Sequence, residues 1–194
     1  MTEKRYKKFC DVVGSRQKYL TLVLENIHDP HNASAILRTA DAVGIDKIYL
    51  VYNTNKFPKM GRNSSASAKK WIELVRFSTI PECYNVLHKE KYKIYSTHMG
   101  ETGKSCSLYD LDLTQKVAIV LGNEHLGVSE EARELADKNF LIPMYGMIQS
   151  LNVSVSAAIC LYEVLRQRTL KGKYQKSAYT KNELKLKLES YLKK

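Results

Sequence analysis

The segment from 24 to 40 places an asparagine at the start of a predicted helix and an arginine within that helix. It reads LENIHDPHNASAILRTA, and its apolar residues after the proline recur at helical spacing. Asn32 is predicted as the N-cap, because an amide side chain can accept a hydrogen bond from a free backbone N–H at a helix start. Arg38 lies about 140° around such a helix from Ala33, so its side chain is predicted to point away from the core. Alone, this pattern is more typical of an ordinary cap and a surface arginine.

Two further segments end an apolar strand in a polar loop. Residues 118–129 read AIVLGNEHLGVS, so a glycine and the carboxylate of Glu124 follow the strand. Residues 141–158 read LIPMYGMIQSLNVSVSAA, and Ser150 and Asn152 stand at the start of an apolar helix. Ligands of open α/β folds bind at the carboxyl ends of the strands. These polar side chains therefore either cap a helix or orient a ligand.

The elements that must position these segments alternate between strands and helices. Strands are predicted from continuous apolar or β-branched runs, and helices from a 3.6-residue periodicity. The predicted strands are residues 21–24, 47–51, 73–77, 92–97, 117–121 and 140–142. The predicted helices are residues 32–43, 80–89, 129–137 and 151–168, and residues 53–67 are a predicted loop. This order predicts an α/β fold with a mostly parallel sheet flanked by helices.

The composition predicts one globular domain with basic ends. The 194 residues are 44% hydrophobic and 26% charged, which is typical of a soluble globular protein. Of the net charge of +11, residues 1–20 carry +4 and residues 166–194 carry +8, whereas the middle carries −1. Both ends are predicted to be helical, and Thr180 and Glu183 have the spacing of a capping box. This layout suits either two flanks that grip a polyanion such as RNA or two solvated helices whose lysines aid solubility.

Other kinds of site are absent or weakly indicated. The sequence Gly-Lys-Ser at 103–105 resembles the end of a phosphate-binding P-loop, but His98 stands where that motif needs its first glycine. His28 and His31 lack further clustered ligands, so no metal site is predicted. No signal peptide or membrane span is predicted, so the predicted location is the cytoplasm. The four cysteines form no C-x-x-C pair and are predicted to be reduced.

Taken together and in this order, the three segments resemble the motifs of the TrmH/SpoU family in the SPOUT methyltransferase superfamily. The matching patterns are N-x-x-x-x-x-R, L-G-N-E-x-x-G and I-P-M-x-G-x-x-x-S-L-N-V-S-V. The resemblance implies a carboxyl-terminal trefoil knot and a homodimer with active sites near the subunit interface. It also implies a methyltransferase domain over residues 19–170, with a basic helical flank at 1–18 and another at 171–194.

The resemblance implies an S-adenosylmethionine-dependent RNA ribose 2′-O-methyltransferase, with guanosine 18 in the D-loop of tRNA as the expected target. The catalytic residues that it implies are Arg38, Asn32, Glu124, Ser150 and Asn152. The cofactor-binding residues that it implies, mainly through their backbone, are Thr97, Leu121, Gly122, Ile142, Met144 and Leu151. The RNA-binding residues that it implies are His31, Arg5, Arg16, Arg166 and Arg168.

Arg38 is the central residue of the implied mechanism. A guanidinium is always charged, so we expect Arg38 to anchor a phosphate and to stabilise a developing alkoxide, although the family's proposals include assisted deprotonation. Asn32 is expected to orient Arg38, and Glu124, Ser150 and Asn152 to position the ribose. Two alternatives remain open. One is methylation of the tRNA wobble position or of ribosomal RNA, and the other is a non-catalytic RNA-binding protein on the same scaffold.

Overall fold

A parallel sheet forms the centre of the computed structural model, which describes residues 1–54, 56–58, 68–98 and 105–194. Its strands are β1 (Leu20–Glu25), β2 (Lys47–Val51), β3 (Glu73–Phe77), β4 (Lys93–Thr97), β5 (Cys106–Ser107), β6 (Val117–Leu121) and β7 (Lys138–Leu141). They lie in the order β3-β2-β1-β6-β4-β7-β5, and every neighbouring pair is parallel. The predicted α/β fold is confirmed, whereas the trefoil knot stays a prediction.

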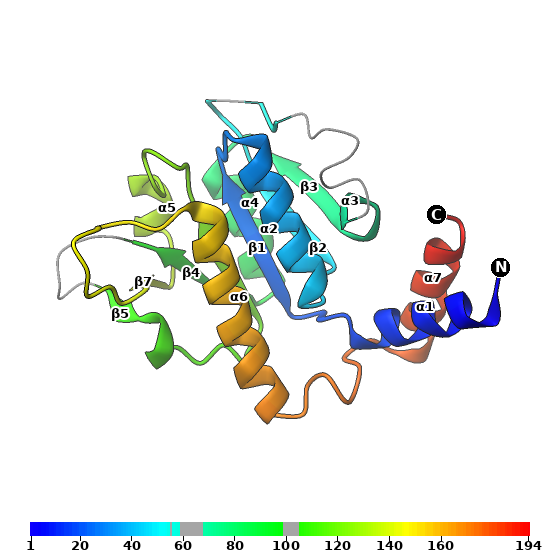
Figure 1. The fold of residues 1–194 in the computed structure, drawn as a ribbon. Helices are drawn as coiled ribbons and strands as arrows, with labels where there is room; N and C mark the ends of the chain where they lie inside the picture. The colour runs from blue at the N-terminus through cyan, green and yellow to red at the C-terminus, as the bar shows by residue number, and fades with distance from the viewer. Residues whose placement is uncertain (55, 59–67, 99–104) are drawn as a thin grey trace.

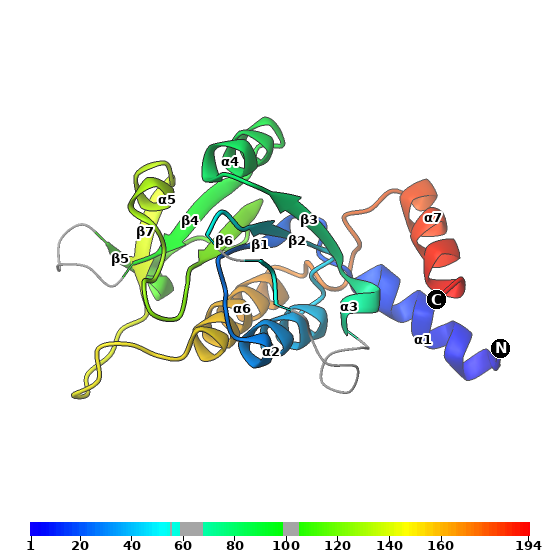
Figure 2. The ribbon, with the colours of Figure 1, turned by 90° about the horizontal axis from the view of Figure 1, so that it is seen from above.

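Helices cover both faces of this sheet. The described helices of the chain are α1 (Glu3–Ser15), α2 (Pro30–Ala42), α3 (Ala68–Trp71), α4 (Ile80–Lys89), α5 (Glu130–Glu134), α6 (Val153–Leu170) and α7 (Lys181–Leu192), with a short 3-10 helix at Leu108–Asp110. Figure 1 shows α2 and α6 side by side on one face, and Figure 2 shows α4 and α5 on the other. Within the described ranges, no helix has the length and hydropathy needed to cross a membrane.

The two faces explain why the central strands are apolar along their whole length. Successive side chains of a strand point to opposite faces, so Leu22 packs in the layer that contains Ile36 of α2, while Val23 packs in the layer that contains Leu87 of α4. Every residue of β1 and β6 is buried. A strand that is covered on both sides cannot alternate between apolar and polar residues, and this produces the continuous runs in the sequence.

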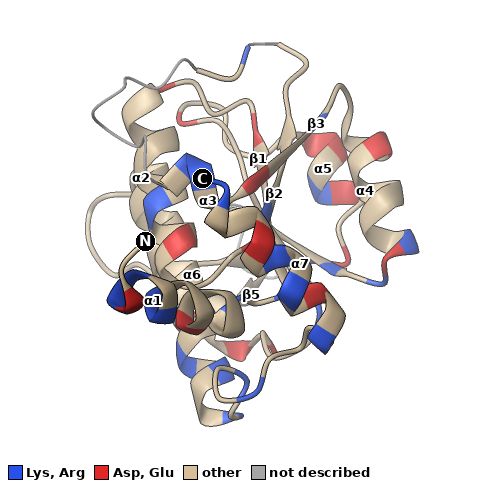
Figure 3. Cartoon of the chain, turned by 90° about the vertical axis from the view of Figure 1, so that its right-hand side faces the viewer, with Lys and Arg blue, Asp and Glu red and all other residues tan. Residues whose placement is uncertain are grey.

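Helices α1 and α7 pack together beside the amino end of β1, and Figure 3 shows that both carry many of the chain's lysines and arginines. Phe9, Val13 and Tyr191 form a small apolar cluster between them. Trp71 of α3 joins it, with its ring centroid 5.6 Å from that of Phe9 and 5.0 Å from that of Tyr191. The predicted helical ends are confirmed, including the capping box that begins α7 at Thr180.

Two helix boundaries differ from the prediction. The N-cap of α2 is Asp29 and not Asn32, because Pro30 suits the first helical position and the Asp29 carboxylate accepts the N–H of His31 at 2.8 Å. Asn32 is therefore inside the first turn, where its side chain is free for a longer-range role. The helix predicted for 129–137 is only Glu130–Glu134, because the chain must turn there to enter β7.

The remaining predicted elements agree with the structure within two or three residues at each end. The short elements α3 and β5 were not predicted, because four and two residues carry no periodicity that a sequence pattern can detect. Of the predicted loop at 53–67, residues 55 and 59–67 lie outside the described part of the chain. The same holds for the first two residues of the P-loop-like sequence at 103–105.

Candidate active site

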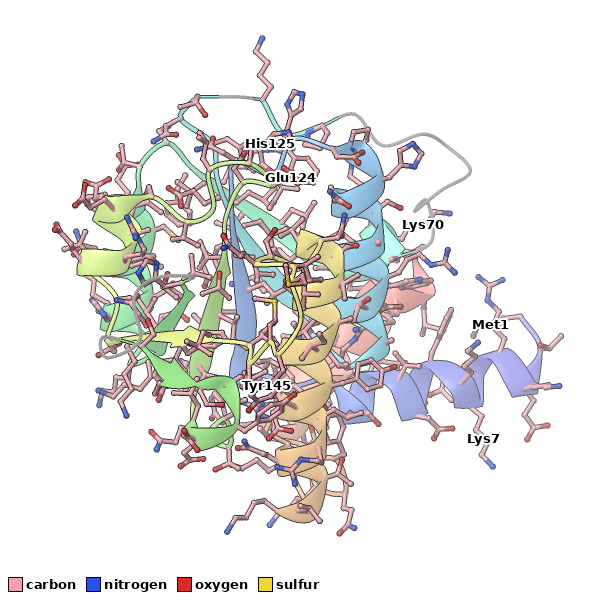
Figure 4. The ribbon with its side chains drawn as sticks, turned by 60° about the vertical axis from the view of Figure 1, so that its left-hand side comes forward. Met1, Lys7, Lys70, Glu124, His125 and Tyr145 are labelled. Atoms are coloured by element: carbon pink, nitrogen blue, oxygen red, sulfur yellow. The ribbon has the colours of Figure 1, made fainter. Side chains whose placement is uncertain are left out.

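The polar residues of the three segments meet at the carboxyl edge of the sheet. Asn32 is in the helix that follows β1, Glu124 is in the loop after β6, and Asn152 is the N-cap of α6. Parallel strands bring their carboxyl ends to one edge, and β1 and β6 are neighbours in this sheet. Figure 4 shows Glu124 and His125 beside the start of α2, away from Met1 and Lys7 on α1.

Four hydrogen bonds join these segments into one network. The Glu124 carboxylate accepts the backbone N–H of His28 at 3.0 Å, the N–H of Asp29 at 3.1 Å and the Asn32 side-chain amide at 3.0 Å. The Asn32 carbonyl oxygen accepts the Asn152 amide at 3.0 Å. The two side-chain contacts bridge residues 92 and 120 positions apart. The loops after β1, β6 and β7 are therefore held relative to one another within a single chain.

Glu124 is an ionised acceptor in this network. Burial alone would raise the pKa of its carboxyl group, but the hydrogen bonds from Asn32, His28 and Asp29 outweigh burial and lower that pKa. A carboxylate with a lowered pKa is a weak proton acceptor, and its oxygens already bind protein donors. Glu124 is thus suited to position the loops and unsuited to remove a proton from a substrate.

The other predicted catalytic residues are exposed at the same edge or on the same helix. Arg38 is exposed on α2, so the prediction that it points away from the core is confirmed. Ser150 is exposed in the loop that leads into α6. The amide nitrogen and oxygen of Asn32 bind Glu124 and Asn152, and its expected role in orienting Arg38 stays a prediction.

The predicted cofactor residues end three adjacent strands. Thr97 is the last residue of β4, Leu121 is the last residue of β6, and Ile142 directly follows β7. These strands are neighbours, in the order β6-β4-β7. Met144 and Leu151 are half-buried in the loop between β7 and α6. The fold therefore brings these residues into one region, and their binding of a cofactor stays a prediction.

Gly122 permits a close backbone crossing directly after β6. A Cβ atom at this position would lie 2.1 Å from the carbonyl carbon and oxygen of Gly127. The loop returns on itself there, with the Gly127 N–H bound to the carbonyl of Asn123 at 2.8 Å. No side chain fits at Gly122, so only glycine allows the chain to cross itself this closely at the edge of the predicted cofactor region.

The loop between β7 and α6 offers unpaired backbone groups to a ligand. Between Met144 and Leu151, no backbone N–H donates a hydrogen bond to another residue in the described part of the chain. Tyr145 and Met147 are each 99% exposed. Buried or ligand-facing backbone amides need partners, and a small molecule with carboxylate and base edges can supply them. These residues fit a cofactor that is held by backbone and needs no charged side-chain motif.

Two of the predicted RNA-binding residues are contradicted by their burial. Arg16 and Arg168 are each only 2% exposed. Arg168 donates to the carbonyl oxygens of Tyr19 at 2.7 Å and Gln115 at 2.6 Å, and burial lowers its pKa to about 10. Arg16 donates to Tyr191 Oη at 2.9 Å. Both guanidinium groups are buried and donate to internal acceptors, so neither is available to a phosphate.

The other predicted RNA-binding residues are accessible. His31 is exposed at the start of α2, next to the network, and Arg5 is exposed on α1. Arg166 is exposed on α6 and donates twice to Glu163, each time at 2.8 Å. Their contact with RNA stays a prediction.

Asn26 and Asn123, to which the sequence patterns gave no role, connect the loops at the same edge of the sheet through hydrogen bonds. Asn26 has a φ of 51°, and its Oδ1 accepts the N–H groups of Asn53 and Thr54 at 3.2 and 3.3 Å. The Asn123 amide donates to the carbonyl of Asn26 at 2.9 Å. These bonds tie the loop after β2 to those after β1 and β6. The available signal was an asparagine after a strand, a residue type that tolerates positive φ.

The sequence from 19 to 162 matches the model of the SpoU rRNA Methylase family. The chain belongs to this family. It is 42% identical over 175 residues to a tRNA (guanosine(18)-2′-O)-methyltransferase of Thermus thermophilus, which covers 90% of this chain and 89% of the relative. It is 37% identical over 174 residues to the protein of that name from Escherichia coli K12, which covers 90% and 75%. The predicted family is confirmed.

Solved structures of the SpoU family share this fold. The Aquifex aeolicus TrmH/SpoU tRNA modifying enzyme superposes with a TM-score of 0.90 at 36% identity, covering 98% of this chain and 97% of that one. The Streptomyces viridochromogenes methyltransferase AviRb, in complex with the cofactor AdoMet, gives a TM-score of 0.71 at 26% identity, covering 82% and 64%. Membership of a methylase family makes this chain a methyltransferase.

Proposed function

We propose that this SpoU family member uses S-adenosylmethionine to methylate the ribose 2′-hydroxyl of guanosine 18 in tRNA. The observation that carries the proposal is the hydrogen-bonded network that joins Asn32, Glu124 and Asn152 at the carboxyl edge of the sheet. Relatives named for this reaction support the choice of substrate, since they share 37% and 42% identity with 90% of the chain. A role in tRNA processing and a cytoplasmic location are part of the same proposal.

The backbone of two loops would hold the cofactor. S-adenosylmethionine, when bound, supplies an electrophilic methyl group on a sulfonium. The open amides from Met144 to Leu151 and the close turn at Gly122 would bind its polar edges, with Thr97, Leu121 and Ile142 beneath it. Binding of this kind fixes the donor on rigid strand ends, which favours in-line attack from about 3–3.5 Å.

Arg38 would act on the RNA. Its exposed guanidinium carries a permanent charge, so it can bind the phosphate beside the target ribose and stabilise the alkoxide that develops as the hydroxyl loses its proton. Glu124 would keep the loops in place, while Ser150 and Asn152 would position the ribose. His31, Arg5 and Arg166 remain the proposed RNA contacts of this set.

A homodimer is part of the proposal. Large apolar side chains are exposed on α6 and on the loop before it, namely Tyr145, Met147, Ile148, Val155 and Tyr162. Large exposed apolar side chains favour association, and a second copy would cover them. The active site would then lie close to the subunit interface, because the same loop carries Ser150.

The basic flanks favour a large RNA as substrate. Helices α1 and α7 lie at the amino end of the sheet, whereas the candidate active site lies at the carboxyl end (Figure 1). A strand of six residues spans about 20 Å, so one nucleotide cannot contact both regions. A folded tRNA can contact both. The proposed organisation is a methyltransferase domain at 19–170 between flanks at 1–18 and 171–194.

The test combines one substitution with mapping of the product. Arg38→Ala should abolish methyl transfer to tRNA and leave the affinity for S-adenosylmethionine within a few-fold, because Arg38 acts on the RNA. Lys89→Ala, which removes an exposed cation of α4, is the control and should keep full activity. Near-normal turnover in Arg38→Ala would remove this residue from the mechanism.

Sequencing of the treated RNA decides between the alternatives. A 2′-O-methyl group at guanosine 18 supports the proposal, and one at the tRNA wobble position or in ribosomal RNA would replace the substrate. A non-catalytic RNA-binding protein would show no calorimetric heat with S-adenosylmethionine.

A further inference from the structure

A cavity of about 440 Å³ lies at the carboxyl ends of β2 and β3, on the same edge of the sheet as the candidate active site. The side chains that give it chemical character are Tyr52, Lys56, Phe57, Arg76, Phe77 and Glu82. None of them belongs to the hydrogen-bonded network or to the proposed cofactor site. The cavity therefore offers a second place for a ligand beside the first.

The aromatic wall of this cavity is held in place by the fold. The Tyr52 hydroxyl donates to the carbonyl of Ile27 at 3.0 Å. The rings of Tyr52 and Phe57 meet edge to face, with centroids 5.4 Å apart and planes at 87°. Ile27 precedes His28, whose N–H binds Glu124, so the wall is one residue removed from the network. A wall that is ordered before a ligand arrives costs little entropy on binding.

The charged residues of the cavity are two cations and one carboxylate, and all three are exposed. The Arg76 guanidinium carbon lies 5.9 Å from the centroid of the Phe57 ring. Glu82 accepts the N–H of Ser78 through Oε2 at 3.4 Å, and in the described part of the chain no hydrogen bond reaches its Oε1. Lys56 provides the second cation. An aromatic ring, two cations and an open carboxylate together match the base and phosphate of a nucleotide.

We propose that this cavity binds a guanine nucleotide of the substrate RNA, close to the ribose that is methylated. Phe57 stacks on the base, and Arg76 and Lys56 bind its phosphate. Glu82 accepts the N1–H and the exocyclic amino group of guanine, whereas adenine presents an acceptor at N1 that a carboxylate repels. The assignment of this guanine to the substrate RNA rests on the proposed function. The recognition of guanine by the cavity is independent of that function.

Binding of mononucleotides tests the recognition of guanine. Saturation-transfer NMR on the full chain should detect guanosine 5′-monophosphate more strongly than adenosine 5′-monophosphate. Phe57→Leu and Glu82→Gln should each lower the affinity for guanosine 5′-monophosphate by roughly fivefold or more. This is the smallest effect expected when one stacking or base-edge interaction is removed. Glu189→Gln, on the exposed side of α7, is the matched control for Glu82→Gln. Equal signals from both nucleotides, or from wild type and both variants, would overturn the proposal.

Methyl transfer to tRNA tests the source of the guanine. Phe57→Leu should raise KM for tRNA roughly 5- to 100-fold and leave kcat and the affinity for S-adenosylmethionine unchanged. Glu82→Gln should raise KM in the same direction without touching the apolar core. If the variants lose affinity for guanosine 5′-monophosphate but keep the wild-type KM for tRNA, the cavity binds a free guanine nucleotide. The proposal that the guanine belongs to the substrate RNA is then wrong. If the wild type transfers no methyl group, the proposed function fails while the mononucleotide result still decides the cavity.

Discussion

Glu124→Gln tests whether the hydrogen-bonded network holds the site together. The substitution keeps the shape of the side chain but replaces one oxygen by an NH2 group. If the remaining oxygen keeps the donors Asp29 and Asn32, the NH2 group faces the N–H of His28 and that bond is broken. A hydrogen bond to a charged group contributes about 1.5–3 kcal/mol and one between neutral groups about 0.5–1.5 kcal/mol. One broken bond and two weakened bonds at a partly exposed carboxylate give about 2 kcal/mol.

Thermal unfolding at pH 7 measures this loss of stability. For a chain of this size, about 2 kcal/mol corresponds to a Tm lower by roughly 4–8 °C. Glu189→Gln is the control, because this exposed glutamate of α7 makes no ion pair with a described residue, and its Tm should stay at the wild-type value. The same Glu124→Gln protein should transfer methyl groups more slowly, because the bond from Asn32, through which residue 124 helps to fix the loop that carries Ser150, is weakened.

The pH dependence gives a second, independent check on Glu124. Its pKa is lower in the folded chain than the ordinary value of 4.5, so its stabilising contribution is fully present above pH 4.5 and is lost as the pH falls through the folded pKa. The difference in Tm between wild type and Glu124→Gln should therefore shrink on acidification below pH 4.5. An equal Tm at pH 7, or a difference that stays constant into the acid range, would refute the reasoning.

Three further variants probe other parts of the molecule. Gly122→Ala should cost at least about 3 kcal/mol and abolish cofactor binding, because its Cβ would lie 2.1 Å from the Gly127 carbonyl, whereas Gly146→Ala meets nothing within 4 Å and should be neutral in a melting experiment. Arg168→Met should cost about 2–6 kcal/mol in urea unfolding, because it removes the guanidinium donors of the Leu113 and Gln115 carbonyls, at about 1–3 kcal/mol each. Glutamine at four exposed cations of α1 should weaken tRNA binding and reduce its salt slope by about 0.7–0.9 for each phosphate interaction removed, and an unchanged slope would make these residues aids to solubility only. Those cations are Lys4, Arg5, Lys7 and Lys8.

The sheet was predictable because burial on both faces leaves a strong mark on the sequence. The runs at Lys47–Val51, Glu73–Phe77 and Val117–Leu121 were located to the residue. Strand order was not predicted, because it depends on pairings between segments far apart, and nothing in a local pattern encodes them. Short elements such as Cys106–Ser107 were not predicted, because two residues carry no sequence pattern and this strand forms only by pairing with a neighbouring strand.

Net charge was a less reliable guide than pattern. The excess of cations at both ends suited either flanks that bind RNA or solvated helices, and counting charges cannot tell which arginines the fold itself needs. Arg16, in the amino-terminal flank, and Arg168, near the end of the central domain, are buried, and each donates to internal acceptors. Removal of residues 1–18 would therefore delete Arg16 together with the core residues Phe9 and Val13, so weaker tRNA binding by that deletion would not isolate the charges.

The role of Asn32 shows what a motif leaves undecided and what the fold then adds. An asparagine after His-Asp-Pro-His satisfied the pattern of an N-cap, and only the helix start at Pro30 frees its amide. That amide gives its nitrogen to Glu124 and its oxygen to Asn152, so one side chain couples the loop after β6 to the start of α6. Loops that are coupled in this way have their relative positions set before RNA binds. Catalysis at this edge would then depend on preorganisation within each chain. A second copy of the chain would cover exposed apolar residues, but it would not be needed to fix the positions of the loops.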